Sequence, residues 1–172
     1  MHSEREENVM EHSFEVTVIA HALATIGNVY FNAEYDVEKV LLIALYHETS
    51  EVITGDLPTP IKYFNKVINS AYKDLETLAA TKLLATLPGE LAAEMKKAVL
   101  PEQSEKEYRL VKCADRLAAY IKCLDELKVG NKEFTKAEAT IKADIEKMPQ
   151  PEVKYFLENV LPAYAKTLDE LE

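Results

Sequence analysis

The sequence predicts an all-α protein, a single-domain helical bundle of about six to seven helices. Apolar residues recur at intervals of three and four positions along almost the whole chain, and strand-like alternation of apolar and polar residues is not apparent. The chain has 172 residues, of which 48% are hydrophobic and only 4 are glycine. Because it shows neither an internal repeat nor a linker-like segment, we expect one domain over residues 1–172.

The first two predicted helices are separated by a polar stretch. One is expected over residues 8–26 and the next over residues 36–50. In each, apolar residues at three- and four-residue spacing mark the side expected to face the core. These residues are Phe14, Val18, Ile19, Ala22 and Ile26 in the first helix and Val37, Val40, Leu41, Ala44 and Leu45 in the second.

A longer third helix is expected to start with Thr59 as its N-cap and Pro60 in its first turn, and to stop near Pro88. A short helix should follow over residues 90–100 and end at Pro101. The expected inward-facing residues of the third helix are Phe64, Val67, Ile68, Ala71 and Leu75.

Three further helices are expected, each with a start signal. A capping box pairs Ser or Thr with a Glu three residues later, and proline is favoured in the first turn. The signals are Ser104 with Glu107, Thr135 with Glu138, and Pro151. The first of these helices should reach Lys128, and the last should continue through Leu168 with a bend at Pro162.

The charge balance argues against some classes of partner. With 30 Asp and Glu against 20 Lys and Arg, the net charge is −10, which disfavours binding to nucleic-acid polymers and to anionic membranes. No apolar run approaches the ~18 residues of a membrane span, and no signal peptide is recognisable. Cys113 and Cys123 lie about 15 Å apart on one predicted helix and cannot pair with each other. Two free thiols favour a cytoplasmic location.

Four ionisable residues lie where the apolar periodicity predicts buried or bordering positions: His12, His47, Glu48 and Asp115. Imidazoles and carboxylates from three helices are what a metal centre in a bundle core requires. Two nitrogen and two oxygen ligands suit a divalent transition ion, which can polarise a phosphoryl oxygen and lower the pKa of bound water.

Spacing alone leaves other interpretations open. A single histidine on a helix is more often a packed or surface residue than a ligand. Asp115 could form a solvated ion pair with Arg116, and Glu48 could face water, because neighbours on a helix point about 100° apart.

Three segments carry a family resemblance: ENVMEHS at residues 7–13, LYHETSEVITGDLPTPIKYFN at residues 45–65 and LVKCADRLAAYIKCLDELKVGN at residues 110–131. Together they resemble the HD-domain 5′-deoxynucleotidases of the YfbR-like family, in the order and approximate spacing of that family. The resemblance implies a helical bundle of the HD-domain type and hydrolysis of 2′-deoxyribonucleoside 5′-monophosphates to nucleoside and phosphate.

The resemblance also implies roles for particular residues. It makes His12, His47, Glu48 and Asp115 the ligands of one divalent transition ion per site, with Co, Mn, Zn, Ni, Fe or Cu as candidates. It gives Glu51 the place of the catalytic acid that positions or activates the attacking water. The residues expected to line the nucleotide pocket are Asp56, Leu57, Pro58 and Thr59. Family members resemble homodimers, so a homodimer is expected here.

The sequence departs from the family pattern in two ways. Glu48 stands where the name-giving His-Asp pair has Asp, which moves the carboxylate by about one bond length. Family members usually carry a further N-terminal helix ending in an Arg-Trp pair that contacts the nucleotide, whereas this sequence begins after that point and has no Trp. We therefore expect that helix to be absent and the activity to be lower than that of a longer relative.

Two alternatives to the deoxynucleotidase function remain at this point. One is another HD-type phosphohydrolase that cleaves a nucleotide pyrophosphate or diester. The other is a catalytically weakened regulatory module that binds metal or nucleotide, which the replacement of Asp by Glu48 favours and the presence of Glu51 and Asp56 disfavours.

Overall fold

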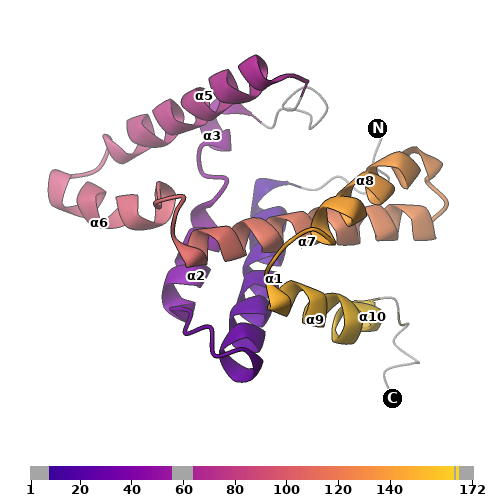
Figure 1. Cartoon of the computed structure of the whole chain (residues 1–172). Helices are drawn as coiled ribbons and strands as arrows, with labels where there is room; N and C mark the ends of the chain where they lie inside the picture. The colour runs from indigo at the N-terminus through magenta and orange to yellow at the C-terminus, as the bar shows by residue number, and fades with distance from the viewer. Residues whose placement is uncertain (1–7, 56–63, 165, 167–172) are drawn as a thin grey trace.

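The computed structural model describes residues 8–55, 64–164 and 166, and in these residues it contains helices and turns but no strand (Figure 1). Within these described ranges seven helices have nine residues or more, in agreement with the predicted fold class. The elements are α1 (Val9–Tyr30), α2 (Val37–Tyr46), α3 (Glu51–Thr54), α5 (Lys66–Leu84), α6 (Gly89–Val99), α7 (Lys106–Lys128), the 3-10 helix η1 (Lys132–Phe134), α8 (Thr135–Ile145), α9 (Pro151–Asn159) and α10 (Leu161–Tyr164).

Helices α1 and α7 form the centre of the bundle, and α2, α8 and α9 pack around them. Ile19 and Leu23 of α1 and Leu110 and Leu117 of α7 are fully buried, together with Phe156 of α9. Helices α5 and α6 lie to one side of this core, where α6 contacts α2 and α5 contacts α3 (Figure 1). Among the described residues, none of the helices combines the length and apolar character needed to cross a bilayer.

The connection between α1 and α2 is held by side-chain contacts. The amide of Asn28 donates to the carbonyl oxygen of Tyr35 at 3.0 Å, and its Oδ1 accepts from the Tyr35 backbone N–H at 2.7 Å. The Tyr35 hydroxyl donates to the buried Glu152 of α9. These contacts fix the return of the chain, so α2 packs along α1 and its C-terminal end comes back toward the start of α1.

The expected inward face of α1 was partly wrong. Ile19 and Ile26 are buried, but Phe14 is 70% exposed and Val18 is 47% exposed. The buried face instead follows Val16, Ile19, Ala20 and Leu23. Because α1 carries apolar residues on nearly all sides, its periodicity did not identify which side meets α7.

The second predicted helix is shorter than expected. Helix α2 ends at Tyr46, and a turn over residues 47–50 leads into the four-residue α3. Val40 and Ala44 are buried as predicted, whereas Leu45 is 50% exposed and Ile43 takes its place in the core.

Helix α5 begins later than expected, at Lys66, where the Asn65 side chain accepts from the backbone N–H of Ile68 at 2.9 Å. The predicted cap at Thr59 and Pro60 lies outside the described residues. Phe64, Val67, Ala71 and Leu75 are exposed, and the buried face is formed by Tyr72, Ala79, Ala80 and Leu84. The helix also stops at Leu84, four residues before Pro88.

Neither predicted capping box forms. The N-cap of α7 is Glu105 without a side-chain capping bond, and Glu107 is buried and accepts from the Asp36 backbone N–H at 3.4 Å instead. The Thr135 hydroxyl donates back to the Lys132 carbonyl oxygen at 2.8 Å. Glu107 therefore makes a tertiary contact instead of a capping bond. Thr135 bonds to the preceding 3-10 turn instead of capping α8.

The last predicted helix is interrupted rather than bent. Helix α9 ends at Asn159 and α10 begins at Leu161, so the break precedes Pro162. Proline has no N–H to donate to the carbonyl of residue 158 and its ring would clash there, which explains a break in the turn that precedes Pro162. The predicted continuation to Leu168 lies outside the described residues. Cys113 and Cys123 are both buried and free, as predicted.

Candidate metal centre

Four of the predicted site residues lie together where α1, α7 and the end of α2 meet. The Nε2 atom of His12 is 3.2 Å from Oδ1 of Asp115 and 3.6 Å from Oε1 of Glu48. The Nε2 atom of His47 is 3.9 Å from each of the same two oxygens. His12 and Asp115 are 103 positions apart in the sequence, so packing of α1 against α7 brings them together.

Local structure places both histidines. The Asn8 side chain caps α1 by accepting from the backbone N–H groups of Met10 and Glu11 at 3.0 and 3.1 Å, so the helix is already formed where His12 occurs. At the other end of the cluster, α2 stops at Tyr46 because the chain turns: the hydroxyl of Thr49 donates to the Tyr46 carbonyl oxygen at 2.7 Å. His47 and Glu48 lie in this turn.

His47 is oriented by its own helix. Its Nδ1 lies 2.7 Å from the carbonyl oxygen of Ala44, and since a carbonyl only accepts, Nδ1 carries the proton. Nε2 therefore presents a lone pair to the cluster, is buried, and has no hydrogen-bond partner among the residues that the structure describes. Burial lowers the pKa of His47 to about 4, so the ring is neutral at neutral pH.

Asp115 is held in its charged form. Burial by itself would raise the pKa of this carboxyl, but the hydrogen bond with His12 and the positive charge of Lys112 outweigh burial and hold the pKa well below its usual range. The cluster thus offers a neutral imidazole with a bare lone pair and an ionised carboxylate on the same side.

This arrangement fits a divalent transition ion. One ligand atom from each of His12, His47 and Asp115 lies within 4.8 Å of the others, and the Glu48 carboxylate adjoins both imidazoles. A buried nitrogen with no partner is costly unless something accepts its lone pair, and a metal ion does so. The Nδ1–H bond to a backbone carbonyl is also the usual way in which a ligating histidine is fixed.

Of the remaining predicted site residues, the structure describes Glu51 only. Glu51 is the first residue of α3, is buried, and its backbone N–H donates to the Glu48 carbonyl oxygen at 2.9 Å. The predicted nucleotide-binding residues, Asp56, Leu57, Pro58 and Thr59, lie outside the described residues. His21 is exposed and is not part of the cluster.

Two contributors were missed in the sequence. The carbonyl of Ala44 orients His47, and no side-chain pattern announces a backbone acceptor. Lys112 lies with its Nζ 3.7 Å from Oδ2 of Asp115. The three-residue spacing between Lys112 and Asp115 was a usable signal, because residues at that spacing share one face of a helix.

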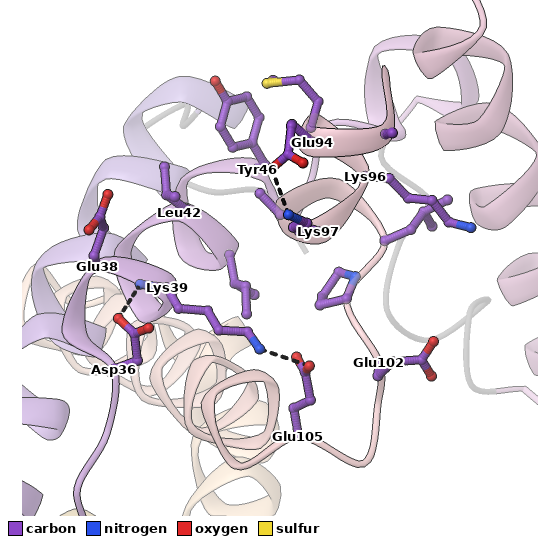
Figure 2. A pocket seen from close by; sticks show the side chains of 16 residues that line it. Asp36, Glu38, Lys39, Leu42, Tyr46, Glu94, Lys96, Lys97, Glu102 and Glu105 are labelled. Carbon is purple, nitrogen blue, oxygen red and sulfur yellow. Dashed lines mark hydrogen bonds and ion pairs between the residues drawn. The ribbon is translucent and has the colours of Figure 1, made fainter. Parts of the chain in front are cut away.

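Two cavities of the described part of the chain lie away from the cluster. One of about 700 Å³ lies between α2, α6 and the segment leading to α7, and Figure 2 shows Lys39 reaching across it to Glu105. The ammonium of Lys39 is 2.8 Å from the Glu105 carboxylate. None of the four residues of the cluster lines this cavity.

Comparison with known sequences agrees with the family resemblance of the three segments. The family model described as 5′-deoxynucleotidase YfbR-like matches residues 1–164. Curated relatives named 5′-deoxynucleotidase from Yersinia pestis (strain Pestoides F) and Yersinia pseudotuberculosis (serotype O:3, strain YPIII) are 47% identical over 173 residues, which covers 99% of this chain and 87% of each relative.

Solved structures share the fold. A structure described as an HD-domain phosphohydrolase from Listeria innocua has a TM-score of 0.84 at 24% identity, and the match covers 96% of this chain and 81% of that chain. A protein from Pyrococcus horikoshii OT3 has a TM-score of 0.67 at 26% identity over 94% of this chain and 84% of that chain. The bundle is therefore of the HD-domain type. With the family model matching nearly the whole sequence, the chain belongs to the YfbR-like 5′-deoxynucleotidase family.

Proposed function

We propose that this protein is a metal-dependent 5′-nucleotidase that hydrolyses 2′-deoxyribonucleoside 5′-monophosphates to deoxynucleoside and phosphate. The observation that carries the proposal is the unpartnered Nε2 atom of His47, which lies in a cluster with His12, Glu48 and Asp115. Membership of the family and the names of the relatives supply the substrate class.

In this proposal His12, His47, Glu48 and Asp115 hold one divalent transition ion, with Co, Mn, Zn, Ni, Fe and Cu as candidates. Such an ion, when bound, neutralises charge on the phosphoryl oxygens and lowers the pKa of its water. The protein contributes a neutral donor at His47, because burial keeps that ring unprotonated, and an ionised carboxylate at Asp115.

Glu51 is proposed to accept the proton of the attacking water. It follows Glu48 by three residues and starts a helix that is tied to the Glu48 turn by a backbone hydrogen bond. Glu51 is buried, and a buried carboxylate that can reach the attacking water is suited to act as a general base. Asp56, Leu57, Pro58 and Thr59 are proposed to bind the deoxyribose and the phosphate, on the basis of the family resemblance.

Several further features belong to the same proposal. The chain is proposed to act as a single domain over residues 1–172, as a homodimer, and in the cytoplasm. The net charge of −10 supports a small nucleotide rather than a nucleic-acid polymer as the substrate.

A second candidate is favoured by one observation. Glu48 occupies the position at which the family pattern has Asp, which supports a catalytically weakened module that binds metal or nucleotide. Metal analysis of the purified protein followed by a panel of nucleotide pyrophosphates, diesters and monophosphates separates these candidates.

The central experiment is phosphate release from dAMP and from AMP by chelator-stripped protein, with and without added Co²⁺. We expect release that depends on the metal and is faster for dAMP. The Glu51→Gln variant should bind metal but lose turnover, whereas Glu94→Gln, an exposed carboxylate of α6, should behave as wild type. Metal-loaded, folded protein that releases no phosphate from dAMP would contradict the proposal.

A further inference from the structure

The charges of the cluster leave the anionic substrate without a counter-charge. The two carboxylates of Glu48 and Asp115 balance a divalent ion, and a histidine that ligates a metal does so as a neutral imidazole. A phosphate monoester brings about two negative charges at neutral pH. Anions at a site with no net positive charge are bound weakly unless a cationic side chain is within reach.

Lys112 brings such a charge to the cluster. Its Nζ atom is 3.7 Å from Oδ2 of Asp115, whereas Oδ1 of the same carboxylate faces the two imidazoles. The Asp115 carboxylate therefore lies between the ammonium and the position that an ion would take. Arg116 follows Asp115 directly but pairs with Asp144 of α8, so its charge is directed away.

The Lys112 side chain is partly exposed, and it pairs with Asp115 in this structure. It is 47% exposed, and its ammonium lies over the Tyr108 ring at 5.9 Å from the ring centroid. A lysine stem is flexible and its ammonium has three rotatable donors, so it can turn from a carboxylate at 3.7 Å toward a phosphoryl oxygen.

We propose that Lys112 binds the phosphoryl group of the substrate, with its ammonium contacting phosphoryl oxygens at the centre formed by His12, His47, Glu48 and Asp115. This rests on the proposed function, and it assigns the phosphate contact to a residue of α7. In this role Lys112 acts on the anion rather than on the metal ligands.

A purely positioning role would have a different signature. If Lys112 served only to hold Asp115, its removal would loosen a metal ligand and weaken metal binding. If it binds phosphate, its removal takes a like charge away from the ion, so metal affinity should be unchanged or higher while phosphate affinity falls.

The test uses inorganic phosphate as the probe and compares wild type with three variants: Lys112→Met, Lys112→Arg and the control Lys154→Met. Lys154 is a helical lysine of α9 that pairs with a carboxylate outside the cluster. Calorimetry measures the Kd for Co²⁺ on chelator-stripped protein, and then the Kd for phosphate on the Co²⁺-loaded protein.

We expect Lys112→Met to weaken phosphate binding about tenfold or more, the loss of one charge-assisted contact. Lys112→Arg should retain most of the affinity, and Lys154→Met should retain all of it. The Kd for Co²⁺ should not rise in Lys112→Met. Unchanged phosphate binding, or a Co²⁺ Kd that rises in parallel with the phosphate Kd, would overturn the proposal.

The test of Lys112 and the test of the nucleotidase function can fail independently. Wild-type protein that binds Co²⁺ and phosphate but releases no phosphate from dAMP would contradict the nucleotidase proposal, and the phosphate Kd values would still decide the role of Lys112. Wild-type protein that binds Co²⁺ but no phosphate would overturn the assignment of Lys112.

Discussion

The Nδ1 atom of His47 donates to the carbonyl oxygen of Ala44 across 2.7 Å, and this contact determines which ring nitrogen faces the cluster. Because Nδ1 carries the proton, Nε2 is left with a lone pair, and it is buried without a hydrogen-bond partner in the described part of the chain. A backbone acceptor one turn earlier in the chain thus prepares the side chain for ligation before any ion arrives.

Removing this nitrogen should abolish tight metal binding. We expect His47→Gln to raise the Kd for Co²⁺ by about 100-fold or more, because loss of even an outer partner of a ligand costs about 10–100-fold. Calorimetry on chelator-stripped protein measures the change. The control is His21→Gln, which alters an exposed histidine of α1 and should leave the Kd unchanged. Equal effects of the two substitutions would show that His47 is not a ligand.

The effects of side-chain charge and side-chain length at residue 48 on metal binding can be measured separately. Glu48→Gln keeps the shape but removes the charge, and we expect its Kd for Co²⁺ to rise by about tenfold or more. Glu48→Asp keeps the charge and should bind Co²⁺ comparably to wild type. The matched control is Glu38→Gln on the exposed side of α2. If Glu48→Gln binds Co²⁺ as wild type does, Glu48 faces water and the ion is held by the other three residues.

The stability of the metal-free protein should depend on the ionisation of His47. Burial lowers the pKa of His47 from 6.5 to about 4. As the pH falls, the unfolded chain therefore takes up a proton near pH 6.5, whereas the folded protein does so only near pH 4. The neutral ring contributes stability that is fully present above the unfolded pKa and is lost as the pH falls through this window, by up to about 3 kcal/mol.

Urea titrations of chelator-treated protein at about pH 7.5 and about pH 5 measure this loss through the free energy of unfolding. Wild type and His47→Gln share every other titrating group, so the variant provides the baseline with which the wild type is compared. We expect the fall in stability between the two pH values to be smaller in the variant. An identical fall would mean that His47 is protonated in the folded state at the lower pH.

Gly27 should be required for the packing of the α1–α2 connection. A Cβ atom at this position would lie 2.7 Å from Cε2 of Tyr35 and 3.2 Å from Cβ of Ala33. Alanine is favoured over glycine inside a helix, but this clash should reverse the sign and destabilise Gly27→Ala by about 1–3 kcal/mol. Gly89→Ala is the control, since a Cβ there meets nothing within 4 Å. Chemical denaturation compares the two, and a stable Gly27→Ala would show that the Tyr35 ring can move aside.

The sequence by itself determined the helical class, the free cysteines and the identity of the residues in the cluster. Helical periodicity depends on local spacing, and the residues that form the cluster are chemically conspicuous wherever they fall. The periodicity of the helices and the family resemblance both predicted that these residues meet, although His12 and Asp115 are 103 positions apart. No local rule fixes such a distance.

Only the tertiary structure decided which side of each helix is buried and how the site is oriented. Phe14 and Val18 match the helical period but are exposed, because α2 and α7 meet another face of α1. Glu107 matches a capping box but packs against the start of α2. The contact of His47 with Ala44 directs the lone pair of His47 toward the cluster, and the contact of Lys112 with Asp115 brings a positive charge beside it. Such contacts depend on backbone position and on neighbouring helices, which a single sequence pattern does not encode.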